Sequence, residues 1–242
     1  MFFRSQILSE QECVEIVASI HRLQAEWQLR DLNGLHTLGA AAYLDAPSIE
    51  TIDHFKLDAP RPGQYTELAC RKNITLRYEF SSLYAKLQAA FDEKLGDTVR
   101  YADGKALPGF HIYSSRPEYS QAASHVPHYD RQYETIDWGK NVQVGSETTL
   151  SFTLTLQQPS SGAGLHVWDV ELEDILKMGK AEAVSYIRKA ECRKEAYHVG
   201  ELFCHPGHTL HRIAPWEYKV GEYRITLQGH AIHIDGHWQL YW

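Results

Sequence analysis

Alternating apolar and polar positions predict strands in the second half of the chain. The segment 148–156 has apolar side chains at every second position, at Leu150, Phe152, Leu154 and Leu156. Successive side chains of a strand point to opposite faces, so this segment is expected to bury one face. Shorter strand-like stretches bounded by turn residues occur at 110–113, 165–168, 201–204, 224–229 and 237–242. Short strands separated by turns favour a β-sandwich or jelly roll.

Helical patterns precede and interrupt these strands. Ser9 and Glu12 have the spacing of a capping box, and an apolar stripe behind them predicts a helix, formed by Val14, Val17, Ala18, Leu23 and Trp27. A second helix is expected over 81–95, ending at Gly96 and burying Leu83, Leu87 and Phe91. Residues 31–66 contain several Gly and Pro and are expected to be irregular. A helical pattern over 170–196 is expected either to cover the barrel mouth or to pad an outer face.

These patterns predict a mainly β fold with flanking helices. We expect a jelly-roll core, also called a cupin-like double-stranded β-helix, with N-terminal helices and a helical insertion near 170–196. A length of 242 residues fits a single domain over 1–242. Its helical and irregular N-terminal part is expected over 1–107, and its jelly-roll core over 108–242.

Composition and charge narrow the class of protein. Hydrophobic residues make up 43% and charged residues 23% of the chain, as in ordinary soluble globular proteins. The formal net charge of −7 argues against nucleic acid or an anionic membrane as a partner. No stretch is long and apolar enough to span a bilayer. The four cysteines form no C-x-x-C pair and are expected to be free thiols, so we expect a cytoplasmic protein.

One short motif carries candidate metal chemistry. His128-Tyr129-Asp130, together with a later histidine, supplies two imidazoles and one carboxylate, which can occupy one face of an octahedral Fe(II) and leave the other open. With 14 His in the chain, a chance His-x-Asp is expected, and His233-Ile234-Asp235 is a second match. We prefer the first because a long β-rich segment follows it, from which a third ligand can return. After the second motif, only His237 remains as a possible third metal ligand.

The third ligand is selected from a histidine-rich turn. His205, His208 and His211 recur at intervals of three around a Pro-Gly turn signal. His205 and His208 are expected to be surface or loop residues, whereas His211 leads into a strand and Arg224 lies on the next. A guanidinium at Arg224 can hold a carboxylate through two parallel hydrogen bonds. An alternative is a zinc site that combines these three histidines with Cys204.

The order of these motifs resembles that of the Fe(II)/2-oxoglutarate-dependent dioxygenases, especially their prolyl-hydroxylase-like members. The resemblance covers roughly residues 108–230 and does not extend to 1–107. The spacing from His211 to Arg224 is slightly longer than in the family. The matching motifs are His128-Tyr129-Asp130, Ser161-Gly162-Ala163-Gly164-Leu165, Gly200-Glu201-Leu202-Phe203, His211-Arg212-Ile213-Ala214-Pro215 and Gly221-Glu222-Tyr223-Arg224.

The resemblance implies roles for individual residues. His128, Asp130 and His211 would be the catalytic ligands of Fe(II), and Arg224 would pair with the distal carboxylate of 2-oxoglutarate. Tyr113 precedes the motif where related enzymes often place a residue that contacts this cosubstrate. Thr226 shares the strand face of Arg224 and is expected to support the same carboxylate. Substrate contacts are expected from the loop after the motif, at Arg131, Tyr133 and Trp138.

The resemblance also implies an activity. The protein would consume O₂ and 2-oxoglutarate, release succinate and CO₂, and hydroxylate a small molecule such as an amino acid or a natural-product intermediate. Asp130 favours hydroxylation or a related oxidation over halogenation, because halogenases of the superfamily lack this carboxylate. A peptidyl- or protein-residue hydroxylase is an alternative of the same class. A zinc-binding or non-catalytic jelly-roll module is an alternative of another class. The sequence leaves the oligomeric state open.

Overall fold

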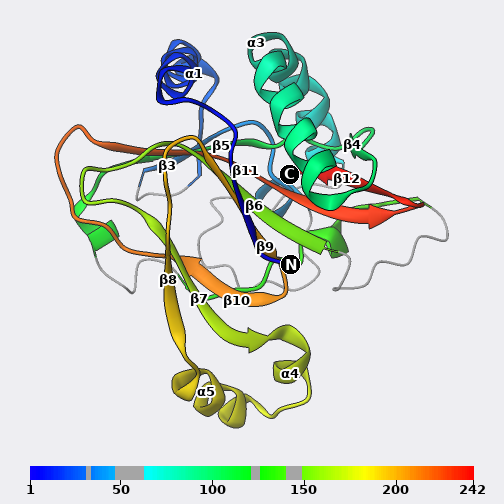
Figure 1. Cartoon of the computed structure of the whole chain (residues 1–242), viewed down its shortest axis with the longest axis vertical. Coiled ribbons are helices and arrows are strands. Elements are labelled where there is room, and N and C mark those ends of the chain that lie inside the picture. Colours follow the sequence, from blue (N-terminus) through cyan, green and yellow to red (C-terminus); the bar gives the residue numbers. More distant parts are fainter. Residues whose placement is uncertain (31–33, 47–62, 121–125, 140–148) are drawn as a thin grey trace.

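Two β-sheets face each other, and helices cover the outer side of the larger sheet (Figure 1). The computed structural model describes residues 1–30, 34–46, 63–120, 126–139 and 149–242. The larger sheet has the strand order β1 (Phe3–Gln6), β9 (Glu201–Pro206), β6 (Thr149–Gln157), β11 (Tyr223–Ile234), β5 (Gly109–Ser114), β3 (Leu35–Leu38) and β2 (Gln28–Leu29). In the same sheet, β12 (His237–Tyr241) pairs with β11 and runs parallel to β4 (Val99–Tyr101). The smaller sheet has the order β10 (Thr209–Ile213), β7 (Gly164–Glu171) and β8 (Cys192–Ala196).

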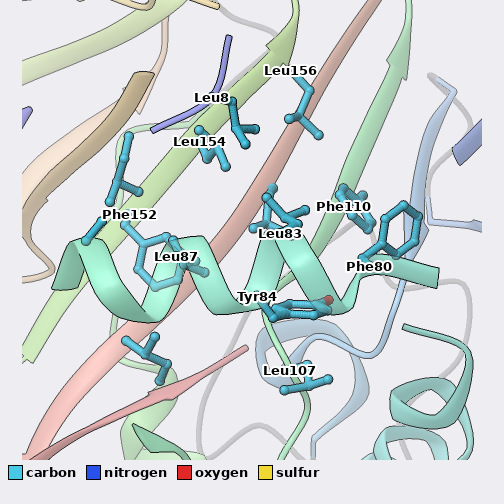
Figure 2. Close-up of a cluster of buried hydrophobic side chains, with 14 of the residues drawn as sticks. Leu8, Phe80, Leu83, Tyr84, Leu87, Leu107, Phe110, Phe152, Leu154 and Leu156 are labelled. Atoms are coloured by element: carbon cyan, nitrogen blue, oxygen red, sulfur yellow. The ribbon is translucent and has the colours of Figure 1, made fainter. Parts of the chain in front are cut away.

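Strand β6 has one apolar and one polar face, as its alternation predicts. Leu150, Phe152, Leu154 and Leu156 belong to one buried apolar cluster with residues of helix α3 (Gln64–Leu95). Figure 2 shows Phe152, Leu154 and Leu156 beside this helix. The opposite face carries buried hydroxyl side chains and lies towards the smaller sheet, at Thr149, Ser151, Thr153 and Thr155. The space between the sheets is therefore lined by polar groups. This two-sheet arrangement has the expected jelly-roll core with flanking helices.

The first helix begins where the capping box predicts. In α1 (Glu10–Arg22), the backbone N–H of Glu12 donates to Ser9 Oγ at 3.3 Å, and the N–H of Ser9 donates to the Glu12 carboxylate at 2.9 Å. The predicted apolar stripe was partly wrong, because the helix ends at Arg22 and Val14 is 62% exposed. The side chains that α1 buries belong to Cys13 and Ile20. A short 3₁₀ turn, η1 (Gln24–Glu26), follows.

The second predicted helix is the C-terminal half of a longer one. Helix α3 (Gln64–Leu95) is kinked at Phe80, whose backbone angles φ −125° and ψ 26° are not helical. The predicted start at residue 81 coincides with this kink. The predicted end is confirmed, because Gly96 caps the helix with a φ of 64°, which glycine adopts without strain. Phe80, Leu83 and Leu87 point from α3 towards the strands (Figure 2).

The N-terminal segment contributes more regular structure than its composition indicates. Within 31–66, expected to be irregular, the structure has β3, the short helix α2 (Ala42–Asp45) and the start of α3. Strand β1 pairs with β9, and β3 pairs with β5, so early segments extend the larger sheet at both edges. Residues 31–33 and 47–62 lie outside the described residues. That the chain is one domain stays a prediction.

The expected insertion contains two helices and a strand. Helices α4 (Leu172–Leu176) and α5 (Lys180–Lys189) lie at the end of the β7–β8 hairpin, away from the larger sheet (Figure 1). Its last part is strand β8, which pairs with β7. In this structure the insertion therefore extends the smaller sheet. All four cysteines are free, and no helix in the described part of the chain has the length and apolar character to cross a membrane.

Candidate metal centre

His128, Asp130 and His211 meet between the two sheets. One potential ligand atom from each lies within 4.8 Å of the others, and this is the group of metal-ligating side chains found among the described residues. The main chain positions all three. His128 and His211 of β10 form an isolated antiparallel bridge. The N–H of Asp130 donates to the carbonyl of Gly207 at 2.8 Å. A Cβ on Gly207 would lie only 3.3 Å from the Cβ of Asp130, so this glycine permits the close approach.

The two imidazoles are oriented by backbone carbonyls. Nδ1 of His128 lies 2.9 Å from the carbonyl oxygen of Val126, and Nδ1 of His211 lies 2.8 Å from that of Thr209. A carbonyl oxygen only accepts, so each Nδ1 carries the hydrogen and each Nε2 presents a lone pair. The ring centroids are 4.6 Å apart. Metal-binding histidines usually have this arrangement, in which the second ring nitrogen fixes the tautomer.

Asp130 is held by hydrogen bonds on both carboxylate oxygens. Ser151 Oγ donates to Oδ2 at 2.6 Å, and Gln132 Nε2 donates to Oδ1 at 3.0 Å. Ser151 Oγ also lies 3.1 Å from Nδ1 of His230 on β11. The same carboxylate lies 3.3 Å from Nε2 of His211 and 3.8 Å from Nε2 of His128. Ser151 of the larger sheet and Gln132 of the segment after Asp130 therefore orient the carboxylate towards both imidazoles.

The electrostatics of the cluster favour an ionised carboxylate. Burial alone would raise the pKa of Asp130, but the neighbouring imidazoles, that of His211 first, hold this pKa well below its ordinary value. Burial would lower the pKa of His211, and Asp130 outweighs that effect, so the pKa of His211 is raised. Two nitrogens and one carboxylate oxygen, without a thiolate, fit Fe(II) with positions left open. The residues present therefore fit the metal that the resemblance implies.

The alternative zinc cluster is not formed. Cys204 lies in the apolar core on the helix side of β9, whereas His205 points to the opposite side of the same strand. His208 lies in the turn before β10, with its Nε2 3.3 Å from the Glu171 carboxylate. Among the described residues, the four proposed zinc ligands do not form one metal-binding group.

His205 is neither at the surface nor in a loop, contrary to the prediction from the sequence. It lies on β9 and is buried, with its ring 4.5 Å from that of His211 and its Nδ1 3.0 Å from the carbonyl of Pro206. Burial lowers the pKa of His205 to about 3. Leu202 and Cys204 lie on the core face of this strand, so extending the predicted strand 201–204 by one residue would have placed His205 on the inner face. The strand was expected to end at residue 204, before the Pro-Gly turn signal, but it continues to Pro206.

The second His-x-Asp motif lies elsewhere. His233 is near the end of β11, with its Nε2 3.1 Å from a carboxylate oxygen of Asp97. Asp235 occupies the turn to β12 with a φ of 54°, in the left-handed region. This pair is not part of the candidate metal group.

Arg224 is a buried cation without a counter-charge among the described residues. It lies on the inner face of β11, and no described residue forms a hydrogen bond with its Nε, Nη1 or Nη2. Its guanidinium carbon lies 5.4, 5.7 and 5.9 Å from the ring centroids of Tyr113, Tyr197 and Trp216. Burying an unpaired charge is costly, so the site fits an anionic ligand. His230, which contacts Ser151, lies on the same face of β11, so the guanidinium and the metal cluster share one inter-sheet space.

The other predicted contacts of 2-oxoglutarate surround Arg224. Tyr113 of β5 is the cross-strand partner of Arg224. Thr226 is fully buried two residues later on the same face, and its Oγ1 accepts a hydrogen bond from Gln228 Nε2 at 3.3 Å. The structure thus brings together the three residues that the sequence selects for the cosubstrate.

The predicted substrate residues lie in and on either side of a short 3₁₀ helix, η4 (Gln132–Thr135), with Arg131 directly before it, Tyr133 inside it and Trp138 after it. Arg131 pairs with Glu134 at 2.8 Å. Tyr133 is buried in a second apolar cluster, and Trp138 packs against it with its Nε1 donating to the carbonyl of Tyr133 at 2.8 Å. Their role in substrate binding stays a prediction. Sequence reasoning missed Ser151 and His230, because only the register between strands identifies them as neighbours of Asp130.

Comparison with known proteins supports the fold. No protein-family model and no curated protein matches the chain. Two solved structures of an N-substituted L-amino acid dioxygenase from Burkholderia ambifaria AMMD, one in complex with alpha-KG, are each 18% identical with a TM-score of 0.52, covering 93% of this chain and 91% of theirs. The alpha-ketoglutarate-dependent epimerase SnoN from nogalamycin biosynthesis is 11% identical with a TM-score of 0.49, covering 97% and 81%. The chain therefore has the fold of the Fe(II)/2-oxoglutarate-dependent dioxygenases that its sequence resembles.

Proposed function

We propose that the protein is an Fe(II)- and 2-oxoglutarate-dependent oxygenase that hydroxylates a small molecule. The observation that carries this proposal is the buried, unpaired guanidinium of Arg224, in the same inter-sheet space as His128, Asp130 and His211. A metal site alone would fit several chemistries. A metal site together with a buried cation fits a cosubstrate that chelates the metal at one end and carries a carboxylate at the other.

Each residue has a defined task in this reaction. His128, Asp130 and His211 would hold Fe(II), with Ser151 and Gln132 fixing the carboxylate. Iron and 2-oxoglutarate supply the oxidising chemistry, in which one oxygen atom of O₂ enters the substrate and the other enters succinate as CO₂ leaves.

The cosubstrate would be held at its far end by Arg224. Arg224 binds the distal carboxylate through parallel N–H···O bonds. The rings of Tyr113, Tyr197 and Trp216 surround the guanidinium and exclude water, which strengthens the ion pair by lowering the local dielectric constant.

The substrate is proposed to be an amino acid or a natural-product intermediate. The net charge of −7 disfavours nucleic acid. The dioxygenase of the same fold acts, by its name, on N-substituted L-amino acids. The same metal centre would also serve a peptidyl-residue hydroxylase, so free amino acids and short peptides belong in one substrate panel.

Anaerobic spectroscopy tests the proposal. Fe(II) and then 2-oxoglutarate are added to the full chain under argon, and a weak visible charge-transfer band is expected from the chelate. The matched control is Asp130→Ala, which should give no band. Absence of the band in the native chain, together with tight stoichiometric zinc binding, would overturn the oxygenase assignment. Succinate formation that rises with one member of the panel would then identify the substrate class.

A further inference from the structure

We propose that His111 and Tyr43 extend the cosubstrate site: Nδ1–H of His111 donates a hydrogen bond to the distal carboxylate of 2-oxoglutarate, and Tyr43 orients the imidazole. This inference rests on the proposed function and adds two residues to it. His111 would be a binding residue, and Tyr43 a positioning residue that acts through it.

Strand register places His111 beside the predicted carboxylate site. His111 of β5 pairs with Thr226 of β11, and Tyr113 pairs with Arg224. Side chains directly opposite each other have Cβ atoms about 5 Å apart. The ring centroids of His111 and Tyr113 are 5.9 Å apart. The four residues therefore occupy adjacent positions on one face of the sheet, the face that carries the unpaired guanidinium.

His111 has a hydrogen-bonding group that nothing in the described residues satisfies. Its side chain is buried, its Nε2 lies 2.5 Å from the hydroxyl of Tyr43, and its Nδ1 has no hydrogen-bond partner. Burial, and next the charge of Arg224, hold the pKa of His111 well below its ordinary value, so the ring is neutral. Burial raises the pKa of Tyr43 well above its ordinary value, so the phenol keeps its proton. Of the two tautomers of His111, the one with its hydrogen on Nδ1 lets this buried hydroxyl donate to Nε2, the ring nitrogen that it contacts. We therefore assign the hydrogen of the ring to Nδ1.

One carboxylate of a ligand would satisfy these donors together. The three guanidinium nitrogens of Arg224 and Nδ1 of His111 are all buried without an acceptor. A carboxylate has two oxygens and about four lone-pair positions, enough for both side chains. An unmet buried donor is costly, which favours occupation of the site.

The nearby cation Arg30 does not compete for this ligand. Its Nη1 and Nη2 bond the two oxygens of Asp45 at 2.6 and 2.8 Å, and its Nε donates to Thr37 Oγ1 at 2.7 Å. Asp45 also accepts the backbone N–H of Ala41 at 2.8 Å. The Arg30–Asp45 pair therefore fixes the turn of α2 that carries Tyr43, and so fixes the Tyr43–His111 contact.

A comparison of two ligands tests the contact directly. The Mn(II)-loaded full chain is titrated calorimetrically with 2-oxoglutarate and with 2-oxopentanoate, which has the same chelating end and no distal carboxylate. His111→Phe is expected to weaken 2-oxoglutarate binding about tenfold and to leave 2-oxopentanoate binding unchanged. His111→Asn keeps a donor near the position of Nδ1 and should retain most of the affinity. The matched control is His36→Phe, because His36 lies on the opposite face of the neighbouring strand β3 and pairs with Ile112.

Tyr43 is tested through its dependence on His111. Tyr43→Phe should weaken 2-oxoglutarate binding roughly threefold in the native background. It should have no effect in the His111→Asn background, which lacks the Nε2 that Tyr43 bonds. A purely structural role of Tyr43 would give the same loss in both backgrounds, and that result would remove Tyr43 from the proposal.

The outcomes separate this inference from the proposed function. Native protein that binds no 2-oxoglutarate in the presence of metal contradicts the proposed function itself. Native binding that needs Arg224 but is unchanged by His111→Phe contradicts only the role of His111. If His111→Phe weakens the binding of 2-oxoglutarate and 2-oxopentanoate equally, the role of His111 is also contradicted. The effect would then lie at the chelating end, which the two oxo acids share. If His111→Phe fails to fold, the Tyr43→Phe and His111→Asn variants still decide the question.

Discussion

The main chains of His128 and His211 hydrogen-bond to each other in both directions, N–H to carbonyl, at 2.9 and 3.1 Å. In an antiparallel ladder, two such bonds set the Cα atoms about 5.5 Å apart. The spacing of these two candidate ligands is therefore fixed by backbone atoms and does not depend on the metal. Replacing one imidazole should remove a ligand without moving the other.

The first prediction concerns the metal ligands. His128→Ala and Asp130→Ala should each abolish metal-dependent succinate formation, because each removes one of three ligands. His233→Ala is the matched control, since it alters the other His-x-Asp motif, and it should leave succinate formation intact. Succinate and bound iron are measured on the same samples. Equal losses from His128→Ala and His233→Ala would show that the wrong motif was chosen.

The second prediction concerns the hydroxyl that holds Asp130. Ser151→Ala should weaken metal binding by roughly 10- to 100-fold, because it frees the carboxylate oxygen that Ser151 binds at 2.6 Å. Ser151→Thr keeps a hydroxyl and should keep most of the affinity. Thr153→Ala removes a hydroxyl from the same face of β6 and serves as the control. Equal metal affinities for Ser151→Ala and Thr153→Ala, measured by calorimetry with Mn(II), would contradict the role of Ser151.

The third prediction separates the role of Arg224 in binding 2-oxoglutarate from its effect on the stability of the folded protein. Arg224→Met should abolish most of the increase in melting temperature that 2-oxoglutarate gives to the metal-loaded protein. It should cost no stability without ligand, because it replaces a buried unpaired charge with an apolar side chain of similar length. Thermal unfolding with and without 2-oxoglutarate measures both effects. A large loss of stability in the ligand-free protein would mean that the aromatic rings around the guanidinium are its main partners.

The fourth prediction is the pH dependence of stability from His111. Its pKa in the folded protein is lowered well below the ordinary value of 6.5, first by burial and then by Arg224. Between those two pKa values the unfolded chain binds a proton that the folded chain does not. Titration of His111 therefore leaves the free energy of unfolding unchanged above about pH 6.5. Below that pH it lowers this free energy, by up to about 1.4 kcal/mol per pH unit. The other charged or titratable groups around this imidazole are Tyr43, Tyr113, Arg30, Arg224, His230 and Asp130.

The check is urea unfolding of the metal-free protein at several pH values between 7 and 4. His111→Asn removes the titrating imidazole. The free energy of unfolding should then fall less steeply with decreasing pH, by the slope that corresponds to about one proton. His36→Phe, on the other face of the sheet, should leave the slope unchanged. Parallel curves for the native protein and His111→Asn would show that the folded protein also protonates His111 in this range.

The fifth prediction concerns the core between α3 and the larger sheet. Leu87 is completely buried there, so Leu87→Ala should lower the free energy of unfolding by about 2–5 kcal/mol. Ile74→Ala on the same helix is the control, because Ile74 is 73% exposed and should change stability very little. Chemical denaturation measures both. A small effect at Leu87 would mean that α3 packs loosely on the sheet.

Local signals predicted the parts of the fold that depend on local interactions. The capping box at Ser9, the cap at Gly96 and the alternation through Leu154 each involve neighbours in sequence, and each is confirmed. Strands β1, β2 and β3 were missed because they are short and lie at or near the sheet edges, where pairing with distant segments defines them. The first half of α3 was missed although its buried residues Tyr65, Leu68, Ala69 and Leu76 recur at helical spacing, because its start lies inside the Gly- and Pro-rich stretch 31–66 that was expected to be irregular.

The same distinction holds for the candidate site. His128, Asp130, His211 and Arg224 were found because their order along the chain is itself a signal. Ser151, His205 and His111 were not assigned to the site, because their positions follow from strand register, which joins segments far apart in sequence. A sequence pattern shows which residues share a face of a strand. It does not show which strand lies alongside.

Because β6 has one apolar and one polar face, the number of residues in this strand matters to the fold and the site as much as their identity. A deletion of one residue early in Thr149–Gln157 would exchange the two faces for the rest of the strand, turning leucines towards the metal and threonines into the core. Point substitutions on the inner face, by contrast, can alter the lining of the active site while leaving the helix-packing face intact. Variation in what the protein oxidises is therefore expected to arise by exchange of side chains on these strands, and changes in chain length should be confined to the connections between them.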